Sequence, residues 1–468
     1  MRALGHQMVD DMMTYLETLR ERPVWQRIPE KVRRNLKRPL PMNPQGAKSA
    51  YQDFIKNVLP HPMGNIHPRF WGWVEGTGTP LCMLAEMLAA GMNPDLGAGD
   101  HVANYVEAHV LDWLKEMLGY PVEASGLLVS GGSTANLTGL TVARNTMAEF
   151  DVRQHGLQAS RKMILYASRE THSSLQKAVE LLGLGNDALR KIPVNAEFQM
   201  ETEALETAIS EDRSEGYQPI VVIGNAGTVN TGAFDNLNAL ADICAREELW
   251  FHVDAAFGAW AALSPKLRHL VSGMERADSL AFDLHKWMYM PFELGCALVR
   301  RKKDQLRAFA LTPDYLARAK GGISGGPVWY SEYGFQCSRG FRALKAWMSL
   351  KEHGVLKYGR LVQQNVEQAR YLAELVDTAP ELERVAPVPL NIVCFRFTAN
   401  GLDKAALNEL NSEILVQLQE SGVAVLSSTM IKGKYALRVA ITNHRSRRED
   451  FELLVREVTR LGNILVKS

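Results

Sequence analysis

Residues 249–257, with the sequence LWFHVDAAF, and residues 278–287, with the sequence DSLAFDLHKW, hold the decisive pattern of this chain. Each stretch begins as a short apolar run with the length and composition of a buried β-strand. The first run reaches Asp254 just ahead of small residues, and the second reaches Lys286 just after His285. If both runs are strands of one sheet, an acid and a lysine can meet in one site.

The surroundings of Lys286 indicate a reactive amine, because a lysine among apolar and aromatic neighbours loses solvation and is more easily deprotonated. Such an amine is a nucleophile. A lysine as Schiff-base partner, with an acid such as Asp254 against a pyridinium nitrogen, is the pairing that pyridoxal phosphate requires. The alternative is that Asp254 and Lys286 are purely structural, since ion-pair networks also perturb such groups.

The composition is that of an ordinary globular protein, with 46% hydrophobic and 22% charged residues among 468. A chain of this length is expected to form about two or three domains. The net charge of +1 predicts neither nucleic-acid nor anionic-membrane binding. The five cysteines form no C-x-x-C pair, which favours a reducing, cytoplasmic location without disulfides or zinc.

Membrane insertion and secretion are both disfavoured. No run approaches the roughly 18 apolar residues of a membrane span. The first residues carry Asp10, Asp11 and Glu17 in place of an apolar signal core.

The N-terminal part, residues 1–79, reads as a helical segment. Residues 1–20 have helical apolar spacing, residues 22–44 are rich in proline and basic residues and predict an extended connector, and a second helix is expected over 49–58. These helices bury little by themselves, so we expect them to pack on another surface, either a second subunit or the chain's own core. Trp71 and Trp73 stand just before a glycine-rich turn, as core residues or as a substrate-pocket wall.

The middle of the chain, residues 80–343, alternates predicted strands and helices. Two helices are expected over 81–118, interrupted at 93–99. The expected strands are 126–129, 162–166, 220–223, 249–253, 279–282 and 295–299, with helices at 137–149, 174–182 and 237–247. This alternation predicts an α/β fold with a mainly parallel, doubly wound sheet and a site at the carboxyl ends of its strands.

The last part, residues 344–468, is predicted to be a small α+β domain. Before it, residues 304–335 break the pattern, and a loop of this length rich in glycine is functional or disordered. Strands are then expected at 392–397, 423–426 and 436–441 among helices.

Four further motifs could complete a cofactor site. Residues 130–136 (SGGSTAN) follow a strand and open a helix, so glycine N–H groups and hydroxyls could hold an anion. His172 lies at another strand-to-helix junction, where it could stack on a ring or cap the helix. The Thr228 hydroxyl follows a third strand, and Tyr315 borders the glycine-rich loop, where a phenol could donate a proton.

In this order and spacing the motifs 130–133 (SGGS), 171–174 (THSS), 252–256 (HVDAA) and 285–287 (HKW) resemble the pyridoxal phosphate-dependent group II amino acid decarboxylases. The resemblance extends over nearly the whole chain and is strongest between residues 126 and 290. It implies pyridoxal phosphate fold type I, the aspartate aminotransferase-like fold, with a mainly parallel seven-stranded sheet covered by helices on both faces. It also implies a homodimer with the active site at the interface.

The resemblance further implies residue roles. Lys286 would form the Schiff base with pyridoxal 5'-phosphate, and Asp254 would pair with the pyridinium nitrogen. His172 and Ala256 would lie on opposite faces of the ring. The phosphate and its surroundings would be held by Gly132, Ser133 and His285.

Tyr315 matches the loop tyrosine that returns a proton after carbon dioxide leaves, whereas related aldehyde synthases commonly have phenylalanine there. Leu284 and Phe257 depart from a common proline and tyrosine. Residues 93–107 are smaller and more polar than aromatic decarboxylases usually have, although Trp71 and Trp73 suit a flat substrate.

We therefore expect decarboxylation of an aromatic L-amino acid. The alternatives are a decarboxylase of a small or acidic amino acid, an aldehyde synthase or aminotransferase, and a non-catalytic scaffold.

Overall fold

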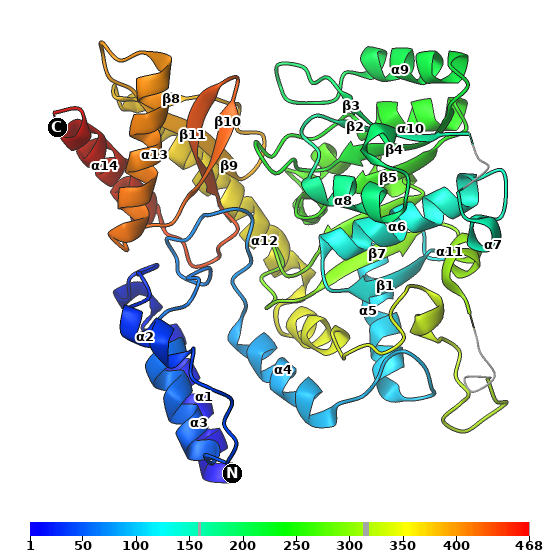
Figure 1. Cartoon of the computed structure of the whole chain (residues 1–468), viewed down its shortest axis with the longest axis horizontal. Helices are drawn as coiled ribbons and strands as arrows, with labels where there is room; N and C mark the ends of the chain where they lie inside the picture. The colour runs from blue at the N-terminus through cyan, green and yellow to red at the C-terminus, as the bar shows by residue number, and fades with distance from the viewer. Residues whose placement is uncertain (158–160, 312–317, 468) are drawn as a thin grey trace. The chain divides into compact units, whose positions relative to one another are not determined.

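The computed structural model describes residues 1–157, 161–311 and 318–467 (Figure 1). It divides the chain into two units. Unit 1 comprises Met1–Thr77, Gln368–Ala386 and Val393–Ser468, and unit 2 comprises Gly78–Glu367 and Pro387–Ile392. The predicted Tyr315 lies outside the described residues. Within those residues, no helix combines the length and apolar character that a bilayer crossing needs.

Unit 2 is built on a seven-stranded sheet in the order β1-β7-β6-β5-β4-β2-β3. The strands are β1 Ser125–Val129, β2 Met163–Ser168, β3 Leu189–Ile192, β4 Gln218–Asn225, β5 Trp250–Asp254, β6 Ser279–Asp283 and β7 Gly295–Val299. Neighbours pair in parallel except β7, which is antiparallel to both β1 and β6. The predicted fold type I with a mainly parallel sheet is confirmed.

Helices cover both faces of this sheet. Successive side chains of a strand point to opposite faces, so each strand contacts helices on both sides. A Cβ added to Gly139 of α6 (Gly132–Met147) would lie 2.8 Å from Cε1 of His252, so His252 faces α6. The opposite face is covered by α10 (Leu237–Arg246). A Cβ added to Gly224 of β4 would lie 2.9 Å from Leu237 of this helix and 3.2 Å from Phe251.

The sequence predicted six of the seven strands to within a few residues. It missed β3, which has only four residues and reads LRKI, with charged side chains between its two buried ends. The remaining helices of unit 2 are α4 Pro80–Met92, α5 Val102–Leu118, α7 Val152–His155, α8 Ser173–Leu181, α9 Thr202–Ser214 and α11 Lys302–Phe309. Helix α12 (Ala343–Thr378) begins in unit 2 and contains a non-helical Gly354 with φ of 67°.

Unit 1 contains a four-stranded sheet in the order β10-β11-β9-β8. Its strands are β8 Leu382–Arg384, β9 Ile392–Phe397, β10 Ser427–Ile431 and β11 Lys434–Ala440, and its helices are α1 Arg2–Glu17, α2 Glu30–Asn35, α3 Ala47–Asp53, α13 Lys404–Glu420 and α14 Arg448–Leu465. Phe54–Val58 continues α3 as a π-helical turn.

Two predictions for unit 1 are wrong. Residues 22–44 are not a purely extended connector, because they contain helix α2. Pro29 is the N-cap residue of this helix and has an extended backbone conformation. Residues 423–426 are not a sheet strand. Val425 instead makes an isolated bridge to Phe70, and the strand begins only at Ser427.

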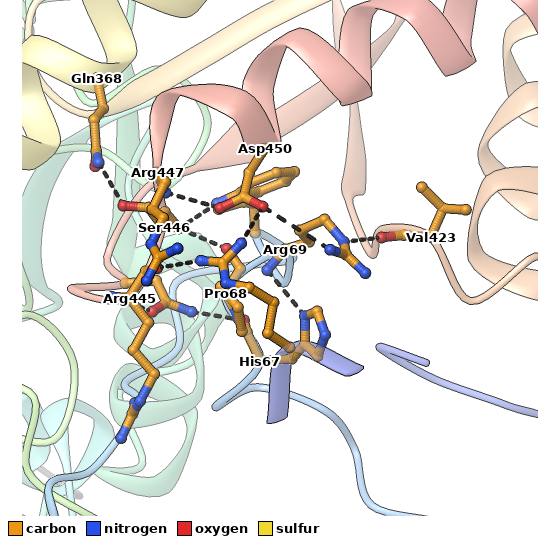
Figure 2. Close-up of polar contacts among 12 residues, drawn as sticks. His67, Pro68, Arg69, Gln368, Val423, Arg445, Ser446, Arg447 and Asp450 are labelled. Atoms are coloured by element: carbon orange, nitrogen blue, oxygen red, sulfur yellow. Dashed lines mark hydrogen bonds and ion pairs between the residues drawn. The ribbon is translucent and has the colours of Figure 1, made fainter. Parts of the chain in front are cut away.

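Polar contacts tie the N-terminal segment of unit 1 to the start of α14, as Figure 2 shows. The buried Asp450 carboxylate accepts hydrogen bonds from Arg20 Nη1 at 2.7 Å and from the Arg447 backbone at 2.8 Å. Arg69 donates through Nε to the Val423 carbonyl at 2.7 Å. Segments more than 350 residues apart in the sequence are thereby joined, since Arg69 and Val423 are separated by 354 positions.

Candidate active site

A cavity of about 360 Å³ in unit 2 lies where several strands end. In a parallel sheet the carboxyl ends of the strands share one edge, so the residues after β1, β2, β5 and β6 converge there. Most of the lining comes from the first turn of α6 together with His172, Asp254, Ala256, Asp283, His285, Lys286, Phe292 and Glu293. The sequence predicted this edge of the sheet as the site.

Lys286 reaches this cavity directly after β6. Its ammonium nitrogen lies 3.0 Å from Oδ2 of Asp283, the last residue of that strand. Asp283 is 1% exposed, and its Oδ1 accepts no hydrogen bond from the described residues. The lysine amine could bind a carbonyl compound, and the remaining acceptor capacity of the carboxylate could be satisfied by hydrogen-bond donors of that compound.

His285 packs beside this pair. Its Nδ1 accepts the Leu294 backbone N–H at 3.1 Å, and its Nε2 lies 3.9 Å from Oδ1 of Asp283. Burial lowers the pKa of His285, so the ring is neutral at pH 7 and carries its proton on Nε2. His285 also packs against Phe292, with ring centroids 4.4 Å apart and ring planes tilted by 36°.

Asp254 ends β5 on the other side of the cavity. Its Oδ1 accepts the Ala256 backbone N–H at 3.1 Å, and its Oδ2 accepts Nδ2–H of Asn136 at 3.0 Å. Burial raises the pKa of Asp254, whereas the nearby Lys286 and His172 lower it. The carboxylate is therefore fixed in position, and a positively charged partner would stabilise its ionised form.

His172 caps α8 with its imidazole. Its Nδ1 accepts the Ser174 backbone N–H at 3.1 Å and lies 2.8 Å from the Ser174 hydroxyl. The side chain is exposed at the cavity, but desolvation by the surrounding protein still lowers its pKa. Because Nδ1 accepts a backbone N–H, the proton of the neutral ring is on Nε2.

The first turn of α6 forms an anion cradle. Gly131 is the N-cap of this helix, and the N–H groups at a helix N-terminus lack partners within the helix. The glycines are required for space, because a Cβ added to Gly132 would lie 2.9 Å from Oδ2 of Asp283. A Cβ on Gly295 would come within 2.6 Å of Gly131 Cα. Ser133 adds a hydroxyl to the cavity lining.

Three other residues predicted for the site are not brought into this cavity. The hydroxyl of Thr228 accepts the Ala233 backbone N–H at 3.1 Å and stabilises its own loop. Trp71 is 1% exposed in unit 1, stacks on Phe451 and donates to the Ser446 hydroxyl at 3.0 Å. Trp73 is 53% exposed in the same unit.

Sequence reasoning missed several cavity residues: Asn136, Ser174, Asp283, Phe292 and Glu293. Asn136 and Asp283 stand inside motifs that had been recognised, so their residue types were visible. The local sequence does not show that the Asn136 side chain lies close to Asp254 or that the Asp283 side chain lies close to Lys286.

A family model described as "Pyridoxal-dependent decarboxylase conserved domain" matches residues 29–398. The chain belongs to this family. An aromatic-L-amino-acid decarboxylase of Bacillus atrophaeus is 34% identical over 466 residues, covering 99% of this chain and 95% of the relative. A phenylacetaldehyde synthase of Petunia hybrida is 30% identical and covers 94% of this chain and 90% of the relative.

Solved structures agree with the family. The crystal structure of Oryza sativa TDC with PLP and tryptamine superposes with a TM-score of 0.92 at 25% identity, covering 99% of this chain and 98% of that one. Mouse CSAD superposes with a TM-score of 0.89 at 25% identity, covering 98% and 99%. This protein is a pyridoxal phosphate-dependent carboxy-lyase that acts on an amino acid.

The cavity fits this cofactor. Lys286 and Asp254 both line it, so an amine is present that could bind the cofactor aldehyde and an acid is present that could pair with the pyridine nitrogen. A phosphate needs N–H donors at a helix N-terminus, which α6 supplies.

Proposed function

We propose that the protein converts an aromatic L-amino acid to the corresponding amine and carbon dioxide in the cavity around Lys286. The observation that carries this proposal is the position of Lys286 and Asp254 in one cavity with the first turn of α6. The aromatic preference is supported by the names of the relatives, which include decarboxylases of aromatic amino acids, tyrosine and tryptophan.

Each residue of the cavity has a role in this proposal. Lys286 binds the cofactor aldehyde covalently, and Asp254 holds a proton at the pyridine nitrogen. Bound pyridoxal phosphate supplies a ring that takes up the electron pair left when the bond from Cα to the carboxylate breaks. His172 and Ala256, which both line the cavity, would lie on opposite faces of the ring. Gly132, Ser133 and His285 would hold the phosphate or its surroundings.

One proton must be added at Cα to complete the reaction. Carbon dioxide leaves from Cα, and Cα must then receive a proton before the amine is released. Tyr315 is the proposed donor, on the resemblance of its position in the sequence to the loop tyrosine of group II decarboxylases. Lys286 would be the amine that holds the cofactor again once the product has left.

A second candidate function is oxidative formation of an aldehyde, and the Petunia hybrida relative at 30% identity favours its inclusion. The tyrosine at position 315 supports simple decarboxylation. Replacing it, as Tyr315→Phe, should convert part of the amine product to aldehyde, with oxygen as the co-reactant. Aldehyde from the unmodified enzyme at the same rate as carbon dioxide would favour the second function.

The chain is also proposed to act as a homodimer with its active site at the interface. In unit 2 the end of α4 and the start of α5 expose large apolar side chains that a partner would cover, at Met87, Leu88, Met92, Val102 and Tyr105. A Leu88→Glu variant should lower the molar mass in light scattering toward that of a single chain. Leu181→Glu, which changes an exposed leucine of α8, should leave it unchanged.

The function is tested with a panel of amino acids in the presence of pyridoxal phosphate, measuring carbon dioxide and amine together. We expect equal yields of both from aromatic amino acids and none from glutamate. Lys286→Ala should abolish both products, whereas Lys302→Ala, at an exposed lysine of α11, should not. A keto acid product, or normal turnover by Lys286→Ala, would contradict the proposal.

A further inference from the structure

Behind the cavity, a chain of buried hydrogen bonds leads from the sheet interior to Asp254. Trp250 and His252 precede Asp254 on β5 at alternate positions, so all three side chains point to the same face of the sheet. The parallel register places Ser279 of β6 beside His252. Trp250 Nε1 donates to the Ser279 hydroxyl at 2.8 Å, and that hydroxyl lies 2.8 Å from His252 Nδ1.

The chain continues through Asn136 of α6. Its Oδ1 lies 3.0 Å from His252 Nε2, and its Nδ2 donates to Asp254 Oδ2 at 3.0 Å and to the Ser174 hydroxyl at 3.1 Å. The Ser174 hydroxyl in turn lies 2.8 Å from His172 Nδ1. One branch from Asn136 thus ends at Asp254, the proposed partner of the ring nitrogen, and the other ends at His172, which is proposed to lie on one face of the ring.

The direction of every bond follows from donor chemistry. A carboxylate only accepts, so the amide nitrogen of Asn136 faces Asp254 and its carbonyl oxygen faces His252. A carbonyl also only accepts, so His252 carries its proton on Nε2. Its Nδ1 must then accept from Ser279, whose oxygen is free to receive the indole N–H of Trp250.

The chain is closed to water, which would otherwise substitute for any lost partner. His252 and Ser279 are 0% exposed and Asn136 is 1% exposed. Burial lowers the pKa of His252 to about 3, so the ring stays neutral with a single proton. Space for this arrangement depends on Gly139, since a Cβ there would lie 2.9 Å from His252 Nδ1 and 3.1 Å from the Ser279 oxygen.

We infer that Ser279, His252 and Asn136 form a positioning relay that fixes proton positions at the proposed ring nitrogen and on the His172 face of the cofactor ring. The relay presents the Asn136 Nδ2–H donor to Asp254, which keeps its carboxylate as an acceptor for a protonated ring nitrogen. Its second branch presents the Ser174 hydroxyl to His172 Nδ1, which keeps the His172 proton on Nε2. This inference rests on the proposed placement of the cofactor.

Hydrogen bonds aligned in one direction polarise one another, so the effect of His252 extends past Asn136 to both ends. Removing the His252 proton leaves the Asn136 carbonyl buried without a donor. The Asn136 side chain can then rotate. Asp254 and the Ser174 hydroxyl would both lose their hydrogen bond from Asn136 Nδ2.

The first test uses the cofactor-free protein, and its readout is taken on the unmodified chain. Nitrogen NMR of protein labelled at histidine should show His252 as a neutral ring protonated on Nε2, unchanged between pH 8 and pH 6. A proton on Nδ1, or a charged ring in this range, would overturn the relay. The resonance is assigned by its loss in His252→Phe.

The second test uses protein loaded with pyridoxal phosphate that is labelled with nitrogen-15 in the ring. In the unmodified protein the ring nitrogen should resonate as a protonated pyridine. His252→Phe should move the resonance toward the unprotonated position and weaken cofactor binding by about tenfold, the equivalent of one charge-assisted hydrogen bond. His252→Gln, which can still donate to Asn136, should restore part of both.

The matched control is Val253→Ala, the next residue of β5, which is 0% exposed and points to the opposite face. It removes buried volume without touching the relay, so it should change neither the ring-nitrogen resonance nor cofactor affinity. Equal changes in Val253→Ala and His252→Phe, or no change in His252→Phe, would overturn the inference. If no amino acid releases carbon dioxide while the ring resonance still depends on His252, the proposed function fails and the relay stands.

Discussion

The amine of Lys286 and the carboxylate of Asp283 are 3.0 Å apart, three residues from each other at the end of β6. The carboxylate is buried, whereas the lysine side chain is 22% exposed toward the cavity. An ammonium group is not nucleophilic, so the amine must lose its proton before it attacks an aldehyde. Formation of the bond to the cofactor must therefore release Asp283 from its partner.

Replacing this acid, as Asp283→Asn, should extend cofactor capture to lower pH. The amide keeps the size of the side chain but no longer stabilises the charged amine, so more of the uncharged amine is present at a given pH. The measurement is the rate of absorbance change after mixing cofactor-free protein with pyridoxal phosphate between pH 6 and pH 9.

The control for this change is Glu293→Gln, since Glu293 also lines the cavity but pairs with Arg342 at 2.8 Å. Its capture profile should match that of the unmodified protein. Identical profiles for all three proteins would show that Asp283 does not govern the amine.

A methyl group at Gly132 should weaken cofactor binding. The added Cβ would lie 2.9 Å from Oδ2 of Asp283 and 3.6 Å from Ala256 Cβ, so either the first turn of α6 or the carboxylate must shift. Crowding of this kind costs about 1–3 kcal/mol. Titration of the Gly132→Ala protein with pyridoxal phosphate should give a correspondingly higher Kd.

Gly91→Ala provides the comparison, because Gly91 lies in α4 with no atom within 4 Å of an added Cβ. Alanine favours a helix over glycine by about 0.5–1 kcal/mol, so this variant should be as stable as the parent or more so, with unchanged Kd. Gly132→Ala with the parent's affinity would rule out a tight cradle.

Arg339→Met should destabilise unit 2 strongly. Arg339 Nη2 lies 2.5 Å from Oε1 of Glu107 and donates to the Leu128 carbonyl at 2.7 Å, and both charged side chains are almost fully buried. Breaking a buried ion pair on one side leaves an uncompensated charge and costs about 3–5 kcal/mol. Because Leu128 precedes the cradle by only a few residues, cofactor affinity should fall as well.

Arg342→Met tests whether burial of the ion pair is responsible for the large loss of stability expected for Arg339→Met. Its partner Glu293 is 53% exposed, so loss of this pair should cost less than about 1 kcal/mol in urea denaturation. Similar losses for the two variants would contradict the assigned importance of the Arg339–Glu107 pair.

Acid should destabilise unit 1 through His67. Its Nδ1 accepts the Arg69 backbone N–H at 3.0 Å, and burial lowers its pKa to about 4 (Figure 2). The unfolded chain binds the proton near the ordinary pKa of about 6.5, so stability is complete above that pH and falls as pH drops from about 6.5 toward 4.

The measurement is urea denaturation at pH 7 and pH 5. His67→Gln retains an acceptor but cannot titrate, so its stability should fall less between these two pH values than that of the parent. His6→Gln, at an exposed position of α1, should follow the parent. An equal fall in all three would assign the acid sensitivity to other groups.

The alternation of strands and helices in unit 2 is legible in the sequence alone, and so are the residues that we propose to be reactive. Apolar runs such as residues 249–253 and 279–282 are local patterns, because burial on both faces of a parallel sheet demands continuous apolar sequence. Lys286 and Asp254 stand at the ends of those runs, so their convergence followed from the strand order of a parallel sheet.

Tertiary structure decided which side chains meet. Asn136 is four residues into α6, and only the packing of that helix on β5 and β6 places its amide between His252 and Asp254. The sequence does not show that the Thr228 hydroxyl accepts the Ala233 backbone N–H or that Trp71 is buried in unit 1. Residue types are encoded locally, whereas hydrogen-bond partners depend on contacts between segments far apart in the chain.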